Sequence, residues 1–272
     1  MMETGSYLFD GFTQSHKELE RLKQQARQIE PFETHLLRSA GLKAGMKVLD
    51  AGCGPGVVSS LMARLVGKDG QVLGVDASEE LLAAARTLAD AEGLGNLTFE
   101  KGDIYDMELG NSSFDFIYSR LVFQHLTHPL KALEGLMHVL KPGGILCISD
   151  IDDKWLSLSP EPESFQSLVN RSVEFQAQQG GDRMIGHKLG SWLTRSGFTD
   201  LDVQVMPVTS KMMGMRQFLQ IGMSFRIFAA ADDEARNLAR SEFESICELA
   251  EIPEAWGFLA VFVATGKKPG LE

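Results

Sequence analysis

The chain has 272 residues, 44% hydrophobic and 23% charged, an ordinary composition for one large globular domain or one domain with a sizeable insertion. Its formal net charge is −11 and its pI is about 5.1, so its surface repels phosphate backbones and anionic lipid. We therefore predict neither a nucleic-acid partner nor a membrane partner.

The N-terminal segment MMETGSYLFD has neither the basic start nor the apolar stretch of a signal peptide. The longest apolar run, residues 258–264, is too short to span a bilayer. The three cysteines, Cys53, Cys147 and Cys247, have no metal-ligand spacing and cannot all pair with one another. Together these features predict a protein of the reducing cytoplasm.

Residues 16–29 are predicted to form an amphipathic helix that ends at Pro31, because apolar residues recur there at steps of three and four. Strands and helices then alternate. The apolar strand candidates are MKVLDAG, QVLGVDA, NLTFEKGD, FDFIYSR and ILCISDI, with a KPGG turn expected before the last. Apolar strands that alternate with helices form a parallel sheet covered on both faces, so we predict an α/β fold.

The pattern changes after residue 151. Helices are predicted over residues 164–178 and in HKLGSWLTRSGF, followed by a strand, LDVQVMPV. Residues 211–251 then read as helical before a last strand, GFLAVFVATGKK. A connection of about 40 residues is too long for a compact sheet, so we interpret residues 211–255 as an inserted helical cap. The other predicted units are an N-terminal segment (1–40), a core (41–210) and a final core strand (256–268).

The loop after the first strand, in VLDAGCGPGVVS, indicates a ligand site. Three glycines, Gly52, Gly54 and Gly56, alternate there with other residues, and ligands of open parallel sheets bind beyond the carboxyl ends of the strands. A dinucleotide loop needs a glycine where this chain has Val57, and a phosphate loop needs a Lys-Ser/Thr pair that does not follow. Asp50 would repel a pyrophosphate and attract an ammonium or sulfonium group. The pattern favours a cationic, phosphate-free ligand, with a tight turn that binds nothing as the alternative.

Acidic residues also end the next two strands. Asp76 lies at the distance along the chain where an acid can accept both hydroxyls of a ribose. Asp103 can accept a hydrogen bond from an adenine amine, and Ile104 can flank the ring. A single acid after a strand is usually solvated, but acids at three successive strand ends point to a shared ligand.

Four segments, VLDAGCGPG, VLGVDAS, KGDIYD and LKPGGILCISD, resemble in order and spacing the motifs of class I S-adenosylmethionine-dependent methyltransferases. The pattern is most similar to that of quinone-biosynthesis and other small-molecule methyltransferases. The resemblance implies a Rossmann-like, mainly parallel sheet of seven strands whose last strand is antiparallel. It also implies S-adenosylmethionine as cofactor and S-adenosylhomocysteine as product.

The resemblance also implies which residues contact the cofactor. Its methionyl part would lie near Asp50 and the glycine-loop backbone, its ribose near Asp76 and its adenine near Asp103, while Arg120 would contribute mainly its main chain. The N-terminal segment is similar to a lid, although a plain surface helix would explain it equally well. The implied cofactor contacts are Tyr7, Gln25 (or Arg21), Asp50, Gly52, Cys53, Gly54, Asp76, Ala77, Asp103, Ile104 and Arg120.

A general base is needed only if the acceptor atom carries a proton, because methyl transfer otherwise depends mainly on positioning. His125, just after the fourth strand, is the candidate base, with a structural histidine at a helix start as the alternative. His128 is expected in a turn, and the two histidines alone form no metal motif, so no metal is predicted. Asp150 and Asp152, at the end of the fifth strand, are candidates to face the acceptor.

The cap is rich in methionine and phenylalanine, which can form either a core or an adaptable binding surface. We predict that Phe218 and Phe225 contact a mostly apolar or aromatic small molecule. The predicted function is methyl transfer to an O, N or C atom of that molecule. The alternatives are an NAD(P)-dependent oxidoreductase and a non-catalytic cofactor- or partner-binding protein of the same fold. The sequence leaves the oligomeric state open, with a homodimer as one option.

Overall fold

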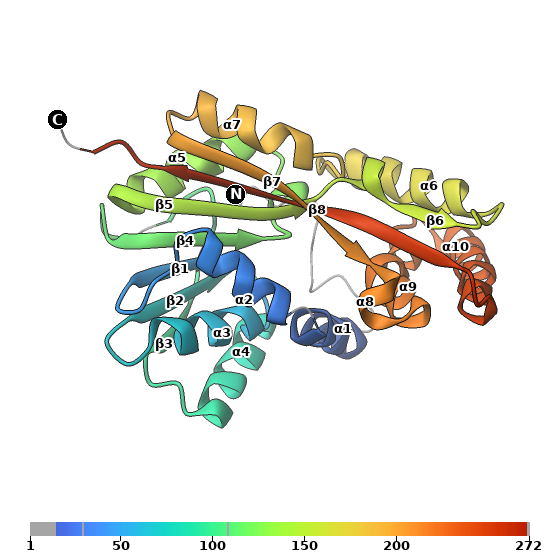
Figure 1. Cartoon of the computed structure of the whole chain (residues 1–272), viewed down its shortest axis with the longest axis horizontal. Helices are drawn as coiled ribbons and strands as arrows, with labels where there is room; N and C mark the ends of the chain where they lie inside the picture. Colours follow the sequence, from blue (N-terminus) through green and yellow to red (C-terminus); the bar gives the residue numbers. More distant parts are fainter. Residues whose placement is uncertain (1–14, 29, 108, 271–272) are drawn as a thin grey trace.

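The computed structural model describes residues 15–28, 30–107 and 109–270 (Figure 1). In this part of the chain the strands are β1 (Lys47–Ala51), β2 (Gln71–Asp76), β3 (Leu97–Lys101), β4 (Phe114–Arg120), β5 (Leu140–Ile151), β6 (Ser157–Ser159), β7 (Thr199–Thr209) and β8 (Trp256–Lys267). They form one eight-stranded sheet in the order β3-β2-β1-β4-β5-β8-β6, with β7 also paired to β8. Strands β1 to β5 are parallel, and β8 is antiparallel to β5, β6 and β7. The predicted mainly parallel α/β fold with an antiparallel last strand is confirmed.

Two details of the sheet differ from the prediction. The additional strand is β6, whose three residues pair with residues 256–258 of β8 and are too few to give a sequence pattern. The KPGG segment lies inside β5 rather than in a separate turn. There the register against β4 shifts between Phe114 and Phe116, and Gly143 has a φ of 75°. This irregularity lets turn-forming residues occupy a strand.

Helices cover both faces of the sheet because its strands are apolar on both sides. Val48 and Phe116 belong to the core on one face, against α2 (Glu30–Ser39), α3 (Val57–Val66) and α4 (Glu79–Glu92). Their neighbours Leu49 and Ile117 belong to the core on the other face, against α5 (Pro129–Val139) and α7 (Leu189–Arg195). The central strands are therefore buried from both sides.

The predicted N-terminal helix is followed directly by a second one. Helix α1 spans Ser15–Gln28, and Pro31 lies in the first turn of α2. Proline is favoured at this position because the first turn of a helix needs no backbone N–H for its own hydrogen bonds. Pro31 thus begins a helix here instead of only ending one.

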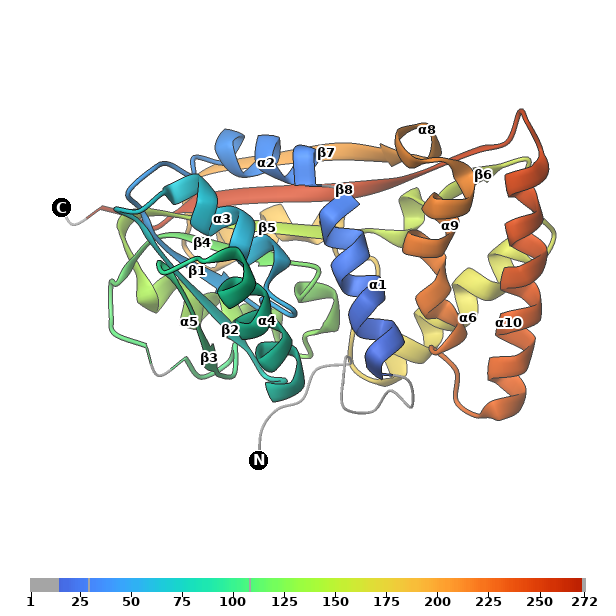
Figure 2. The same cartoon turned by 90° about the horizontal axis from the view of Figure 1, so that it is seen from below.

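The cap region (residues 211–255) contains most of α8 (Ser210–Met213), then α9 (Met215–Met223), the 3-10 helix η5 (Ser224–Ile227), α10 (Asp233–Cys247) and η6 (Glu248–Glu251). Its apolar residues pack against α6 (Phe165–Gln178) in a third core that includes Phe165, Phe218 and Phe243. Figures 1 and 2 show α6, α9 and α10 together at one end of the molecule, with α1 between this group and the helices of the sheet. The layer over this end is therefore larger than the predicted cap, because α6 lies outside residues 211–255.

None of the described helices is long and apolar enough to cross a membrane.

Candidate active site

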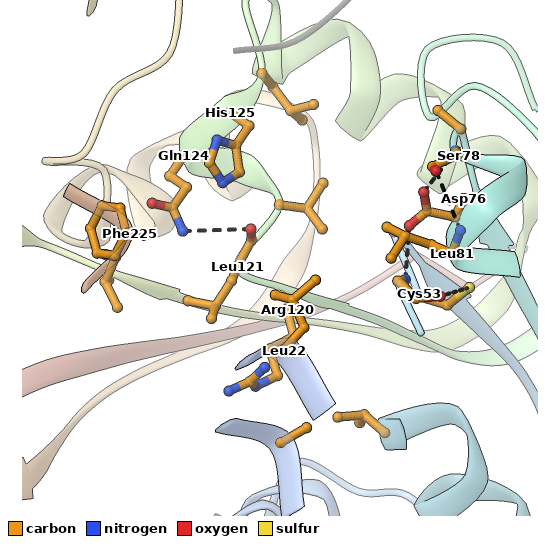
Figure 3. Close-up of a pocket in the computed structure, with 18 of the residues that line it drawn as sticks. Leu22, Cys53, Asp76, Ser78, Leu81, Arg120, Leu121, Gln124, His125 and Phe225 are labelled. Carbon is orange, nitrogen blue, oxygen red and sulfur yellow. Dashed lines mark hydrogen bonds between the residues drawn. The ribbon is translucent and has the colours of Figure 1, made fainter. Parts of the chain in front are cut away.

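A cavity of about 590 Å³ lies at the carboxyl ends of β1 to β5, between the sheet and the cap. This volume is typical of pockets for small organic ligands. Figure 3 shows two groups of residues around it: Cys53, Asp76, Ser78 and Leu81 on one side, and Gln124, His125 and Phe225 on the other. We call these the strand-end half and the cap half of the cavity.

The glycine loop brings bare backbone to the strand-end half. The amides of Gly52 and Cys53 donate to the carbonyl of Val75, at distances of 2.8 and 3.0 Å, which ties the loop to β2. Gly52 has a φ of 81°, and a Cβ atom there would lie 2.3 Å from a methyl carbon of Val122. Only glycine fits this position, since both the backbone conformation and the neighbouring side chain exclude a larger residue.

Asp76 joins the glycine loop to the start of α4. Its carboxylate accepts hydrogen bonds from the backbone amides of Gly54, at 2.8 Å, and Ser78, at 3.0 Å. Ser78 in turn caps α4 by accepting from the amide of Leu81. The Asp76 side chain and Ala77 line the cavity. An anionic group is thus held at the end of β2 in a fixed position.

Asp50 is a buried carboxyl group at the end of β1, only 2% exposed, and it lines the same half of the cavity. The hydroxyl of Ser59 donates to it at 2.6 Å. The pKa of Asp50 is raised to about 7, mainly by burial and also by the nearby Asp76 and Glu33, against the lowering effects of Ser59 and Arg120. A cation bound beside Asp50 would therefore stabilise its ionised form.

The third strand end contributes Asp103 and Ile104, which both line the cavity. The carboxylate of Asp103 accepts from the amide of Tyr105 at 2.9 Å, which fixes the turn after β3. The three acids predicted at successive strand ends therefore lie around one cavity.

Arg120 lines the cavity with its side chain, which is 15% exposed, and its Nε lies 3.2 Å from a carboxylate oxygen of Glu33. Glu33 is buried on α2 and also accepts a hydrogen bond from the hydroxyl of Tyr118. The sequence analysis did not identify Glu33. Glu33 lies one turn before Leu36 and Leu37, on the buried face of α2, and this spacing is the sequence pattern that could have indicated it.

His125 ends the 3-10 helix η2 (Phe123–His125) and lines the cap half. Its Nδ1 lies 3.4 Å from the side-chain nitrogen of Gln176 on α6. Burial, with smaller contributions from Arg183 and Arg21, lowers the pKa of His125 to about 3. The imidazole is therefore neutral near pH 7, and its low basicity makes it a weak general base.

A cluster of buried charges that the sequence analysis did not identify also lines the cap half. Arg183 donates to both carboxylate oxygens of Asp153, at 2.6 and 3.2 Å, and Arg226 donates to one of them at 3.0 Å. Arg183 also donates to the side-chain oxygens of Gln124 and Gln176. These residues come from four separate segments, so no local motif signals the cluster.

Two residues predicted to contact the acceptor do not line the cavity. The carboxylate of Asp150 is buried and accepts from the backbone amides of Gln124, at 3.1 Å, and Ile151, at 2.8 Å. Phe218 is 1% exposed inside the third core. Asp152, just after β5, lines the cavity and Asp150 does not, and the helical turn after α9 brings Phe225 there instead of Phe218. The prediction for Asp150 and Phe218 is corrected accordingly.

The predicted lid is only partly described. Tyr7 and the side chain of Gln25 lie outside the described residues. Arg21 and Leu22 of α1 do line the cavity.

Asp152 also lines the cavity, and its carboxylate lies 2.6 Å from Nδ1 of the half-exposed His187. Among the described residues there is no group of three or more His, Cys, Asp or Glu side chains that could hold a metal ion.

Comparison with known proteins gives consistent matches. A family model described as a methyltransferase domain matches residues 42–197. An uncharacterized transposon protein of Streptomyces fradiae is 31% identical over 66% of this chain and 50% of its own length. A ubiquinone/menaquinone biosynthesis C-methyltransferase of Idiomarina loihiensis is 27% identical over 64% of this chain and 75% of its own length. The structure of phosphoethanolamine N-methyltransferase 2 from Haemonchus contortus, with S-adenosylmethionine bound, aligns with a TM-score of 0.58 at 24% identity. That alignment covers 88% of this chain and 52% of the other, so the chain spans about half the length of several proteins that it matches.

Proposed function

Because the chain belongs to the methyltransferase domain family, we propose that it transfers the methyl group of S-adenosylmethionine to a small-molecule acceptor. The proposal rests on one observation: Asp50, Asp76, Asp103 and the glycine loop all line the same cavity. The three carboxylates can accept hydrogen bonds from an amine and from hydroxyls and can attract a cation, and the glycine loop exposes its backbone. A ligand with a sulfonium, a ribose and an adenine matches all of them.

In this proposal the strand-end half of the cavity binds the cofactor. Asp76 accepts the ribose hydroxyls, and Asp103 with Ile104 borders the adenine. The backbone of Gly52, Cys53 and Gly54 approaches the methionyl part. Asp50 supplies the negative charge that favours a sulfonium. Burial raises the pKa of Asp50 when no cation is beside it, and a bound sulfonium would favour its ionised form.

S-adenosylmethionine, when bound, would supply an electrophilic methyl group: a lone pair of the acceptor would bond to the methyl carbon, and the electrons of the broken C–S bond would remain on the sulfur. The protein holds the acceptor near that carbon, an effect worth up to about 7–11 kcal/mol. The cap side chains Phe225 and Phe228 help to exclude water from the cavity. His125 is neutral and can accept a proton only from an acceptor that becomes strongly acidic during transfer. Positioning is therefore the main catalytic device that we propose.

Calorimetric titration of the protein with S-adenosylmethionine, S-adenosylhomocysteine and NADH tests the proposed cofactor. We expect the first two to bind and NADH not to bind, because Asp50 beside the glycine loop repels a pyrophosphate. Binding of NADH alone would replace the proposal with a dinucleotide-dependent reaction. Cofactor binding without methyl transfer to any of a broad set of metabolites would instead favour a non-catalytic role.

A further inference from the structure

The cap half of the cavity contains more buried positive charge than its partners neutralise. Arg183 and Arg226 are 4% and 1% exposed, and both form their ion pairs with the single carboxylate of Asp153. Neither arginine forms an ion pair with any other carboxylate of the described residues. Arg183 holds both oxygens of Asp153, whereas Arg226 shares one of them. The three groups together therefore carry a net charge of +1.

Other titratable groups lie near the cluster, but none of the described ones forms an ion pair with Arg183 or Arg226. Asp152 is hydrogen-bonded to His187 and to the backbone amide of Lys154. Asp150 accepts from backbone amides, and burial raises its pKa to about 7 against the lowering effects of these hydrogen bonds and of Arg183. His125 is neutral, since burial lowers its pKa to about 3.

Arg226 is the least satisfied member of the cluster. One Nη donates to Asp153 and the other to the hydroxyl of Ser172, but its buried Nε has no hydrogen-bond partner among the described residues. A buried donor without a partner is unfavourable, and more so when the group is charged. Burial, with help from Arg183, lowers the pKa of Arg226 to about 10, which also indicates that its charge is incompletely balanced. Arg226 lines the cap half of the cavity, next to the space that a ligand there would occupy.

An apolar wall stands beside this cation. The ring of Phe225 lies 4.3 Å from the guanidinium carbon of Arg183 and 4.9 Å from that of Arg226. Ile221, Phe228 and Leu156 line the same cavity. A matching ligand combines one negative charge with an apolar or aromatic body.

We propose that the methyl acceptor is a small organic carboxylate whose carboxylate group binds Arg226 and whose apolar or aromatic body lies against Phe225. A guanidinium and a carboxylate are matched in shape and form strong charge-assisted hydrogen bonds. One carboxylate neutralises the net +1 of Arg183, Arg226 and Asp153, whereas a phosphate dianion would leave these three groups with an excess negative charge. This identification of the substrate class rests on the proposed methyl transfer.

The test measures binding of three matched acid–amide pairs: benzoate and benzamide, cinnamate and cinnamamide, hexanoate and hexanamide. Calorimetry is done with and without saturating S-adenosylhomocysteine. We expect at least one carboxylate to bind at least tenfold more tightly than its amide. Equal affinities for acid and amide in every pair, or no binding by any carboxylate, would overturn the proposal. Tighter binding of phenyl phosphate than of any carboxylate would also overturn it.

Variants of Arg226 locate the site. Arg226→Gln leaves Asp153 paired with Arg183, so we expect it to fold, to bind S-adenosylhomocysteine normally and to lose the preference for carboxylates. Arg226→Lys keeps the charge and should keep part of the preference. The control is Arg216→Gln on the exposed side of α9, where the preference should persist. Retention of the full preference in Arg226→Gln would contradict the assignment. Failure of the parent protein to bind S-adenosylhomocysteine while carboxylates still bind would count against the proposed cofactor, and not against the anion site.

Discussion

The carboxylate of Asp76 accepts from the amides of Gly54 and Ser78 and also lines the cavity. Replacing Asp76 with alanine removes the group that we expect to accept the ribose hydroxyls. Hydrogen bonds to a charged group contribute about 1.5–3 kcal/mol each, so affinity for S-adenosylhomocysteine should fall at least tenfold. Calorimetry measures the loss, and circular dichroism verifies the fold. Asp69→Ala, at an exposed position, is the matched control and should bind like the parent. Near-parental affinity in Asp76→Ala would refute the ribose assignment.

The raised pKa of Asp50 predicts a pH dependence that separates cofactor from product. The pKa of Asp50 in the folded protein, about 7, lies above the usual value of 3.8, so the folded state favours the protonated carboxyl group. The contribution of Asp50 to folding stability is therefore complete below pH 3.8 and is lost as the pH rises through 7. A sulfonium beside Asp50 favours the ionised form. The affinity for S-adenosylmethionine relative to S-adenosylhomocysteine should therefore decrease as pH falls below 7, by up to about tenfold per pH unit.

Titrations at pH 6, 7 and 8 measure this ratio, and groups common to both ligands cancel in it. Asp50→Asn should make the ratio independent of pH, because the amide has the shape of the carboxyl group but no proton to release. The assignment is wrong if the parent and Asp50→Asn give the same pH profile.

The acids of the strand-end half were predictable from the sequence, whereas the charged cluster of the cap half was not. Asp50, Asp76 and Asp103 each follow a recognisable strand, and the carboxyl ends of parallel strands meet at one edge of a sheet. Arg183, Arg226 and Asp153 are distant in sequence and meet only through the packing of the segment after α6, η5 and the segment after β5. Phe218 and Phe225 are seven residues apart and look alike in a helical pattern, yet one is core and the other lines the cavity.

At the scale of elements, α10 begins at an N-cap that predicts a measurable contribution to the stability of the cap. The carboxylate of Asp232 accepts from the amide of Ala235 at 2.8 Å. Asp232→Ala should lower the free energy of unfolding by about 0.5–2 kcal/mol, the usual loss for an N-cap. Urea denaturation measures it.

The adjacent variant Asp233→Ala is the control for this loss. Asp233 has an 89% exposed side chain whose only ion pair among the described residues is with Arg236, an exposed i,i+3 contact. Such pairs contribute about 0.3–0.5 kcal/mol. An equal or larger loss in Asp233→Ala would show that the N-cap does not dominate.

Most elements were predictable, because strands β1 to β5 carry continuous apolar runs and their helices have one apolar face. The exceptions have physical causes. Strand β6 is too short to show a pattern, and Pro31 can either end or begin a helix. The association of α6 with the cap depends on contacts between Phe165 and residues about 50 to 80 positions further along, which no local pattern reports.

At the scale of the whole molecule, the cavity is lined by α1, the strand ends and the cap together. A ligand that binds only this folded arrangement stabilises it by an amount set by its concentration and affinity. At 100 times its dissociation constant, S-adenosylhomocysteine should raise the free energy of unfolding by about 2.7 kcal/mol. Thermal or urea unfolding with and without the ligand measures the increase. No increase at a saturating concentration would mean that the ligand does not bind the folded chain preferentially.

Strands β7 and β8 pair directly up to Thr209 and Phe258, the residues that flank the helical insertion. The ends of the insertion are therefore fixed side by side by the sheet, whatever lies between them. Closing a longer or shorter loop between fixed ends changes the chain entropy only slightly. The sequence and length of the helical insertion can therefore diverge to suit different acceptors, while Asp50, Asp76 and the glycine loop stay in place on the parallel strands.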